Sequence, residues 1–439
     1  MENLNNNSRW QSHRGSSTES GQKGFIVTLI VFFILLMMLS VALSMISLIF
    51  YRQQISINAF KSTQSYYAAE AGMEDALMKL RNNSSLSISS TCSINGVTTN
   101  NCYILDVNGV TASIIIPIAI AGSRTVTTQG NNTGIVRKVQ TIWSIDNSLV
   151  NFYYGVSVGS GGLQNDGTIH GNVFSNGNIT GSGTIDNNVV ISGHGNSIKD
   201  VYVGGDVLAY SCLSSASVKN LTYVSGGFHT CSVRGTTSVQ SSEISSEPMP
   251  IPQSQIDSWK NDAVTGGTFS GNKIITTSQS LGPLKITGDL TVKSGATLTL
   301  TGTLWVVGNV LVDSQNTVIN LDSSFGSLGG IIVSDGTFTV DHPNITLTGT
   351  GQQGSYLLII STNTSDTAID IKNNLTGYSA LYTSKGGLTL RNGVSVVEAT
   401  GYKIIMINGS EIQYSTGVEN IFFSSGSGGK WKVTSWGEK

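Results

Sequence analysis

The sequence of 439 residues has little charge, and only six of its residues are proline. Charged side chains make up 11% of the chain, against about 25% in an average soluble domain, which excludes a coiled coil and a charged disordered tail protein. The net charge of −2 gives no reason to expect a nucleic-acid partner. Glycine supplies 51 residues without a Gly-X-Y period, which excludes collagen and favours many short strands joined by tight turns.

Only four cysteines are present, and they form two local pairs, Cys92/Cys102 and Cys212/Cys231. Neither pair has CxxC spacing, and no histidine lies at zinc-ligand spacing from them. We therefore predict two local disulfides in an oxidising compartment rather than a metal site, with free buried thiols as the alternative.

Recognisable catalytic signatures are also missing. The five histidines form no HExxH or triad-like pattern, and there is no P-loop. The nearest approach to the carboxylate cluster of a polysaccharide lyase or glycosidase is two aspartate pairs, Asp335/Asp341 and Asp366/Asp370. Aspartate is common in turns, so we expect turn residues here, no catalytic site, no metal and no cofactor.

One feature that the chain does have is a long apolar run. Phe25–Phe50 contains 26 residues without a charge. As a helix it would extend about 39 Å, enough to cross a bilayer with some tilt. The run exceeds the ~7–15 apolar residues of a cleaved signal peptide, so we expect it to be retained. Arg9, Arg14 and Lys23 precede it and favour an N-terminus in the cytoplasm, with the rest of the chain outside.

Helical character continues beyond the apolar run to about Asn83 without proline. Tyr66, Met73, Leu77 and Leu80 recur at a spacing that places them on one helical face. We therefore predict one helix over residues 25–83, half in the membrane and half outside. The alternative is a plain signal anchor followed by a stalk.

The residues around this helix resemble a known family. Gln22-Lys23-Gly24-Phe25 before a long apolar helix is similar to a type IV prepilin, in particular the PilX-like minor pilins. That group's helix often carries an AAEAG run, which resembles the motif Tyr66, Tyr67, Ala68, Ala69, Glu70, Ala71 and Gly72.

The resemblance implies that residues 1–24 are a leader, which a prepilin peptidase removes by cutting between Gly24 and Phe25. The helix would then remain in the cytoplasmic membrane and assemble with other pilin or pseudopilin subunits. Most major pilins have a glutamate at the fifth mature position, where this chain has Leu29. An unpaired buried charge is costly, so a paired one would specify register along a filament. Its absence implies a minor, initiating or tip subunit.

The remainder of the chain predicts an α+β region followed by mainly β structure. Alternating apolar runs in residues 84–151 predict a small antiparallel β domain against the helix. Residues 152–235 contain short apolar stubs every four to six residues between Gly and Asn, which predicts a first β-solenoid module. Residues 236–267 contain three prolines and then Ile256, Trp259 and Ala263 at helical spacing, which predicts a linker and a short helix.

Residues 268–439 show the clearest repeat. Six three-strand units recur at intervals of 20 to 27 residues, beginning at Leu284, Leu304, Gly330, Leu357, Ala380 and Lys403. The pattern favours a second β-solenoid module, a parallel β-helix, over a β-sandwich. We expect Trp431 and Trp436 to cap its last coil, because solenoid ends need protection.

These patterns together predict a minor pilin-like subunit of a type IV pilus or a related secretion pseudopilus. Its β-solenoid would be displayed at the cell surface for adhesion or surface contact. A surface glycan or host-cell ligand is a candidate partner, because Tyr356, Tyr378, Tyr382 and Tyr402 lie on neighbouring coils, although they are equally suited to a core. The alternatives are a membrane-anchored β-helical carbohydrate-active enzyme and a static cell-envelope protein.

Overall fold

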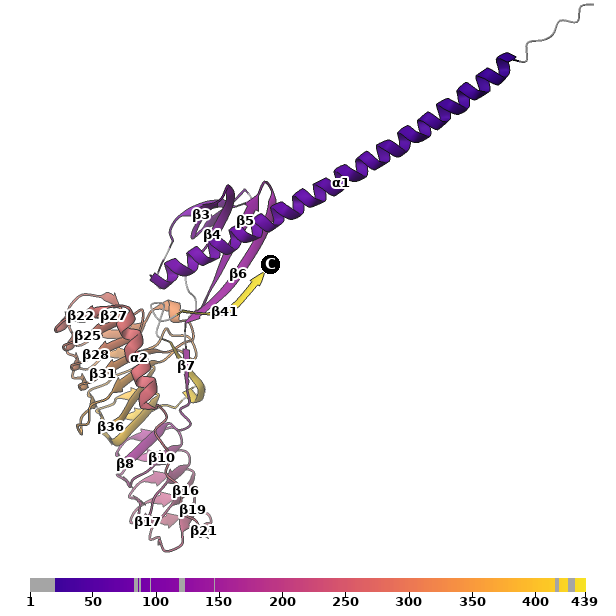
Figure 1. Ribbon diagram of the computed structural model, residues 1–439. Helices are drawn as coiled ribbons and strands as arrows, with labels where there is room; N and C mark the ends of the chain where they lie inside the picture. Colours follow the sequence, from indigo (N-terminus) through magenta and orange to yellow (C-terminus); the bar gives the residue numbers. More distant parts are fainter. Residues whose placement is uncertain are drawn as a thin grey trace, which may run out of the picture.

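The computed structural model describes residues 20–82, 86, 88–94, 96–117, 123–145, 147–414, 418–424 and 431–439. Most of the predicted leader, residues 1–19, lies outside this part of the chain. The molecule consists of a long N-terminal helix, a small antiparallel sheet that covers the end of that helix, and a β-solenoid beyond the sheet (Figure 1).

Helix α1 (Ser20–Asn82) is continuous from the apolar run to the end of the predicted helix. Its N-terminal half projects away from all other elements (Figure 1). Its last turns pack on the antiparallel sheet, with Met73 and Leu80 fully buried and Tyr66 and Leu77 partly buried. The predicted apolar face is therefore confirmed.

The antiparallel sheet has the order β3-β4-β5-β6-β41. Its first four strands come from residues predicted to form this domain, and a separate β1–β2 hairpin precedes them. The strands are β1 (Thr91–Ile94), β2 (Val97–Asn100), β3 (Cys102–Val107), β4 (Val110–Ile115), β5 (Ser123–Asn132), β6 (Ile135–Ile145) and β41 (Trp431–Glu438).

The C-terminal strand corrects one prediction. β41 pairs antiparallel with β6, so Trp431 lies opposite Ile145 and Trp436 opposite Thr141. The tryptophans do not cap the solenoid, because β6 offers a free sheet edge that the returning chain completes. A second antiparallel pair, β7 (Asn147–Val150) with β40 (Ile421–Ser424), joins the outgoing and returning chains between sheet and solenoid.

The solenoid has three parallel faces, and most coils contribute one strand to each face. The first face contains β22 (Thr268–Phe269), β25 (Leu284–Ile286), β28 (Leu304–Val306), β31 (Gly330–Ser334), β34 (Leu357–Ser361), the first halves of β36 (Ser379–Arg391), β38 (Glu398–Ile407) and β8 (Val156–Asn165), and then β10 (Val173–Ser175), β13 (Val189–Ile191), β16 (Asp206–Ala209), β19 (Asn220–Val224) and β21 (Thr237–Gln240).

The other two faces follow the same order of coils. The second contains β23 (Lys273–Ile275), β26 (Leu290–Val292), β29 (Val310–Val312), β32 (Phe338–Val340), β35 (Ile369–Ile371), the second halves of β36, β38 and β8, and β11 (Ile179–Thr180), β14 (Ser197–Lys199) and β17 (Ser211–Leu213). The third face consists of two sheets. One contains β24 (Gln279–Leu281), β27 (Thr297–Leu300), β30 (Val318–Leu321) and β33 (Thr346–Leu347), and the other contains β37 (Ser395–Val396), β39 (Glu411–Ile412), β9 (Thr168–Ile169), β12 (Thr184–Ile185), β15 (Tyr202–Val203), β18 (Ser217–Val218) and β20 (Ser232–Val233).

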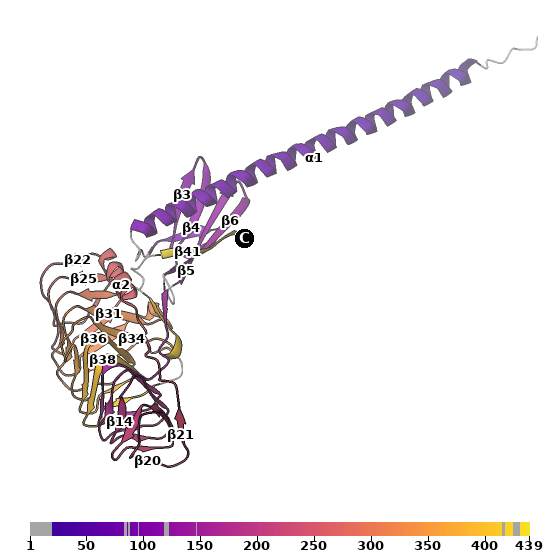
Figure 2. The ribbon, with the colours of Figure 1, turned by 60° about the horizontal axis from the view of Figure 1, so that its bottom comes forward.

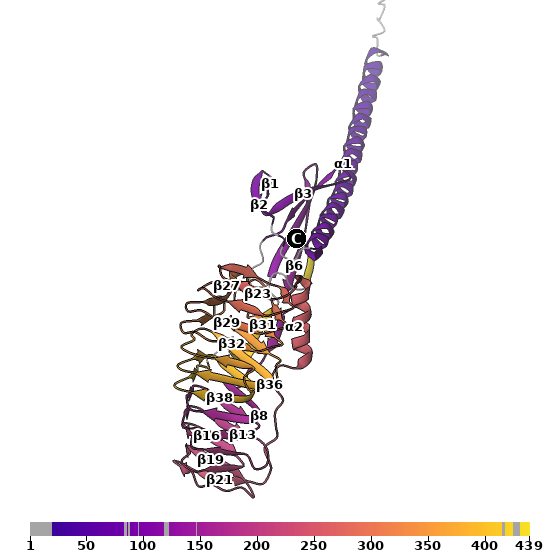
Figure 3. The same cartoon turned by 90° about the vertical axis from the view of Figure 1, so that its left-hand side faces the viewer.

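These faces confirm the parallel β-helix and show that the two predicted modules form one continuous stack. The chain enters at β8 in the middle of the stack and coils to the β21 end (Figure 3). It then returns to the other end, begins again at β22 and coils back until β38 pairs with β8. The last coil of the chain therefore lies directly on its first coil, with Ala399 opposite Val156 and Met406 opposite Asn165.

The return path is an extended segment, residues 241–252, followed by α2 (Gln253–Thr265). The segment is bonded to several coils: His194 contacts Glu243 at 2.7 Å, Asn176 donates to the Glu247 carbonyl, and Tyr382 donates to the Ile251 carbonyl at 2.6 Å. Figure 2 brings the β20–β21 end of the stack forward.

Helix α2 covers the outer side of the first face in the upper coils. Ile256, Trp259 and Ala263 are buried, as their spacing predicts, and the helix contacts β25, β28 and β31. The outward-facing residues of β31 and β34 pack in one apolar cluster with α2 and with Phe152 and Phe423 from the segments beside the stack. Both strands are therefore buried on both sides and apolar up to their final serine, whereas uncovered strands such as β29 alternate.

The inside of the stack is filled by Val, Ile and Leu from all three faces, and its corners are held by amide ladders. Asn272 accepts from the Asp289 amide, Asp289 from the Asn309 amide, and Asn309 from the Thr337 amide, at 2.7 to 2.9 Å. Each acceptor side chain satisfies a backbone N–H of the next coil that would otherwise lack a partner. The Asn and Gly content of the sequence follows from these corners.

Unit boundaries in the last coils differ from the predicted ones. Lys403 is opposite Gly387, so the sixth predicted unit begins on the second face rather than the first. Strands β36 and β38 each run through the corner as one strand, which leaves no turn signal at the boundary. The end of that unit, Ile421–Ser424, belongs to β40 outside the stack, and β21 extends the first module to Gln240.

Candidate functional site

The predicted processing site and membrane segment both lie on α1. Gly24 and Phe25 are within the helix, and the Phe25 side chain is 70% exposed. Leu29, at the fifth position after the predicted cut, is also exposed. Among the described residues one helix is long and apolar enough to cross a membrane, and no residue of its apolar window is buried. This surface therefore has to be covered by lipid or by other helices.

The AAEAG motif lies at the contact between α1 and the sheet. Ala68, Ala69 and Gly72 are buried at the contact, and a Cβ on Gly72 would lie 3.1 Å from the Ile114 side chain. Thr128 of β5 donates its hydroxyl to the Ala69 carbonyl at 2.8 Å. Small residues at this spacing let the helix backbone approach the strands, which gives the motif a packing role.

Gly130 of β5 takes part in the same contact, although no sequence pattern points to it. A Cβ on this residue would lie 1.8 Å from the Ser65 carbonyl oxygen. Ser65 is held in place because its hydroxyl donates to Ile135 at 2.7 Å and accepts from the Asn132 amide. Only the tertiary contact makes glycine necessary here.

The remaining residues of the motif are polar or face outward. The Tyr66 hydroxyl donates to Glu70 at 2.7 Å, and this bond raises the pKa of Tyr66. Tyr67 is 63% exposed, and Ala71 is half-buried. Beside them Arg137 forms an ion pair with Glu438 at 2.9 Å, so the C-terminal strand is tied to β6 close to the helix.

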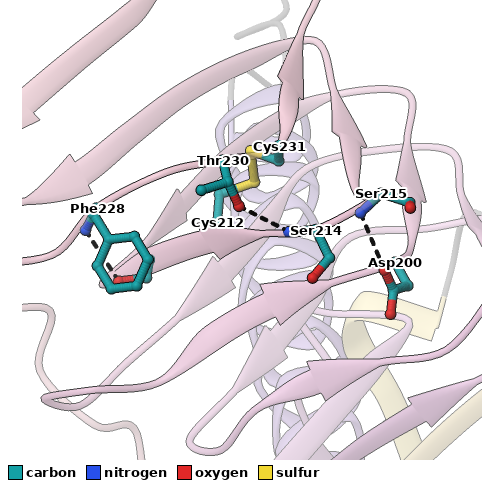
Figure 4. Close-up of a disulfide and its surroundings, with 8 residues drawn as sticks. Asp200, Cys212, Ser214, Ser215, Phe228, Thr230 and Cys231 are labelled. Carbon is teal, nitrogen blue, oxygen red and sulfur yellow. Dashed lines mark hydrogen bonds between the residues drawn. A yellow bond between two sulfur atoms is a disulfide. The ribbon is translucent and has the colours of Figure 1, made fainter.

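Disulfides join both cysteine pairs. Cys92–Cys102 links β1 to the start of β3, and Cys212–Cys231 links two adjacent coils near the β21 end of the stack. Around the second bridge, the Ser214 amide donates to Thr230 at 3.0 Å (Figure 4). The described residues contain no free cysteine.

The aspartates considered as catalytic candidates have basic partners. Asp335 contacts Lys260 of α2 and accepts from the Trp305 indole at 2.8 Å. Asp341 pairs with Lys372 at 2.8 Å, and that hydrogen bond lowers its pKa.

The second pair is similar: Asp370 lies 3.1 Å from Arg391, and Asp366 lies 3.6 Å from Lys403. Each of the four carboxylates therefore lies beside a basic side chain of α2 or of another coil. No group of three or more His, Cys, Asp or Glu side chains in the described ranges is placed to hold a metal ion.

Glu398 is the carboxyl group that differs from these four, because it is not part of an ion pair among the described residues. Glu398 lies on the first face beside the coil contact between β38 and β8 and is fully buried. Its Oε1 accepts from Thr400 at 2.5 Å, and its Oε2 has no hydrogen-bond partner within the described residues. Burial raises the pKa of Glu398 well above its ordinary value, and the bond from Thr400 offsets this only in part.

Glu398 predicts a pH-dependent stability. The folded state retains the proton on Glu398 to a higher pH than the unfolded state does. The contribution of this protonation to the free energy of unfolding is therefore full below about pH 4.5, and it is lost at about 1.4 kcal/mol per pH unit as the pH rises towards the folded pKa. Urea unfolding of the detergent-solubilised chain should show this slope, and Glu398→Gln should remove it. Glu74→Gln, at an exposed position, serves as the control. Parallel pH profiles for wild type and Glu398→Gln would disprove the assignment.

Of the four tyrosines named from the sequence, two are core residues and two are exposed. Tyr356 and Tyr382 are buried, at 4% and 0% exposure, whereas Tyr378 and Tyr402 are exposed by 57% and 41%. The structure therefore separates two structural tyrosines from two that are open to solvent.

The chain is similar to a solved pilin structure. No family model and no curated protein sequence matches the chain. The competence-associated pilin ComZ from Thermus thermophilus is 14% identical, and the match covers 86% of this chain and 97% of that one with a TM-score of 0.19. At that TM-score the two chains do not superimpose as whole molecules.

Proposed function

We propose that the chain is a minor pilin-like subunit of a type IV pilus or a related secretion pseudopilus. The observation that carries the proposal is α1, a single helix whose apolar half is unburied and whose other half packs on an antiparallel sheet. This is the arrangement that the prepilin-like residues around Gly24 and the AAEAG motif imply. Before assembly the helix would hold the protein in the cytoplasmic membrane, with the sheet and solenoid outside.

Assembly would use the exposed apolar half of α1. In a filament that surface would be covered by the equivalent helices of other pilin subunits instead of lipid. Leu29 supplies no carboxylate to pair with a neighbouring N-terminus, so this chain lacks the charge that would specify a repeated register. We therefore infer an initiating or tip position rather than repeated incorporation.

The solenoid is connected to the antiparallel sheet at two points, and this connection would hold it away from the membrane helix. The chain leaves the antiparallel sheet through β7 and returns through β40 and β41, so two paired segments connect the solenoid to the domain on α1. A stack held this way would project as a stiff body from the helix and present its sides and far end for adhesion or surface contact (Figure 1).

Processing at Gly24 tests the pilin assignment. Coexpression with a prepilin peptidase should yield a mature chain that begins at Phe25, and Gly24→Val should abolish the cut because the protease must accommodate backbone that glycine permits. Edman sequencing or mass spectrometry of the N-terminus measures the result. Gly21→Val, three residues upstream, should leave cleavage unchanged. An intact leader in the wild-type chain contradicts the proposal.

A static envelope protein would give a different result in the native cell. Immunogold labelling of sheared filaments should detect the solenoid if the chain is a filament subunit, whereas label that stays with the cell envelope indicates an anchored protein. The alternative of a carbohydrate-active enzyme is not favoured by the contacts of the four candidate aspartates, each of which is paired with a basic side chain. We therefore propose a non-catalytic role for the solenoid.

A further inference from the structure

Two adjacent depressions lie on the solenoid at the corner between its third and first faces. Their volumes are about 360 Å³ and about 420 Å³, and Tyr378 lines both. The first is lined by Gly351, Gln352, Gln353, Gly354, Ser355, Tyr356 and Tyr378, and the second by Gly377, Tyr378, Ser395, Val396, Val397, Gln413 and Tyr414. We call this surface the tyrosine groove.

The lining residues come from four successive corners of the stack: the corners before β34, β36 and β38, and the one after β39. Because neighbouring strands are about 4.8 Å apart, three steps between coils give a length of about 14 Å. Such a length suits an extended ligand of several linked units rather than a single small molecule.

Tyr378 forms an exposed aromatic ridge between the depressions. Its side chain is 57% exposed, and its ring meets that of buried Tyr356 edge to face, with centroids 6.4 Å apart. On the other side, Tyr414 is held by a hydrogen bond from its hydroxyl to the Phe152 carbonyl. Tyr378 is therefore packed against Tyr356, while more than half of its surface remains open to solvent for stacking on a ligand.

The glutamine-containing loop at one end is held in place before any ligand arrives. Ser355 donates its hydroxyl to the Leu328 carbonyl at 2.8 Å and accepts from the Thr350 amide at 3.0 Å. Gly351 and Gly354 have φ values of 86° and 88°, a backbone conformation that residues with a side chain rarely adopt. Gln352 and Gln353 are exposed at the rim on backbone that is already held in place, so binding has to order their side chains but little of the backbone.

The lining has a specific chemical character. Among the described residues that line the two depressions none is charged, and the polar groups are glutamine amides, serine and tyrosine hydroxyls and backbone. Amides and hydroxyls both donate and accept hydrogen bonds, which matches the hydroxyl groups of a sugar, while the tyrosine ring matches its C–H face. An anionic ligand would find no cation in this lining to pair with.

We propose that the tyrosine groove binds an uncharged oligosaccharide, with Tyr378 as the stacking platform and Gln352, Gln353 and Gln413 as hydrogen-bonding groups. This assigns a ligand class and a site to the surface contact proposed above. Glycan binding is measured on the isolated chain without filament assembly, so its failure is distinguishable from failure of the pilin assignment.

The test uses the full chain purified in detergent on an array of oligosaccharides. The probes are gluco-, galacto-, manno- and N-acetylglucosamine oligomers together with sulfated and sialylated glycans. We expect binding to at least one neutral oligomer in preference to the anionic glycans. Tyr378→Ala should weaken it at least tenfold, whereas Tyr378→Phe should retain most of it because the ring remains.

Tyr402→Ala is the matched control, since Tyr402 is an exposed tyrosine of the same stack that lines neither depression. It should change the affinity less than twofold. Circular dichroism and urea unfolding establish that each variant is folded. Failure of the folded wild-type chain to bind any neutral oligomer, a preference for anionic glycans, or equal losses in Tyr378→Ala and Tyr402→Ala would overturn the proposal.

Discussion

Gly130→Ala is expected to lower the free energy of unfolding of the helix–sheet domain by about 3 kcal/mol, the upper end of what overpacking costs. The added Cβ would lie 1.8 Å from the Ser65 carbonyl oxygen and 3.0 Å from the Ala69 nitrogen, both backbone atoms of α1. Neither can rotate away, so helix and sheet would have to separate. The hydrogen bond from Thr128 to Ala69 would lengthen at the same time.

The measurement is urea unfolding of the detergent-solubilised chain combined with amide exchange in β4, β5 and β6. Gly437→Ala in β41 is the matched control, because a Cβ there meets no atom within 4 Å, and its effect should stay within about 0.5 kcal/mol. If Gly130→Ala left amide protection in β5 unchanged, the close approach of helix and sheet described here would be incorrect.

Trp259→Ala should destabilise the solenoid by about 3 to 5 kcal/mol, the usual cost of truncating a buried large aromatic residue. Trp259 is 2% exposed and meets Phe423 edge to face, with ring centroids 6.2 Å apart. The cavity would loosen α2 from the first face and expose the outward-facing Ile331 and Val333 to water.

Limited proteolysis at residues 241–267 and urea unfolding should both register this loss. Trp436→Ala, at 45% exposure on β41, controls for the removal of a tryptophan and should have a small effect. Equal sensitivity of the two variants would mean that α2 does not contribute to holding the stack together.

The spacing of apolar residues over short stretches of sequence was enough to predict several parts of the fold. The spacing of Met73 and Leu80 placed them on the buried face of α1, and the spacing of Ile256 and Trp259 did the same for α2. Short apolar stubs between Gly and Asn predicted the coils, because each coil is built from local alternation and local turns.

The position of the C-terminal strand was not predictable in the same way. Trp431–Glu438 reads as a strand, but its partner β6 lies almost 300 residues earlier in the chain. Any extended segment offers the same backbone hydrogen bonds, so the alternation of the strand does not identify its neighbour. What identifies β6 as the partner of β41 is its unprotected edge, and that edge exists only in the folded domain.

In the candidate site, the motif around Ala69 and Gly72 was visible in the sequence, whereas its partners Thr128 and Gly130 were not. Glycine and threonine are so frequent here that one of each carries no signal. Tyr378 shared its sequence context with Tyr382, and only the fold shows that one is exposed and the other buried under the return segment.

The sequence by itself determined that the chain has a helix long and apolar enough to cross a membrane, a small antiparallel region and coils of parallel strands. These follow from periodicities within about 30 residues. Only the tertiary structure decided that the stack begins in its middle and closes on itself at β38 and β8. The reason is that periodic coils present nearly equivalent edges, so their order depends on where residues 241–265 carry the chain and what they bind. The low charge and high glycine content suit either order.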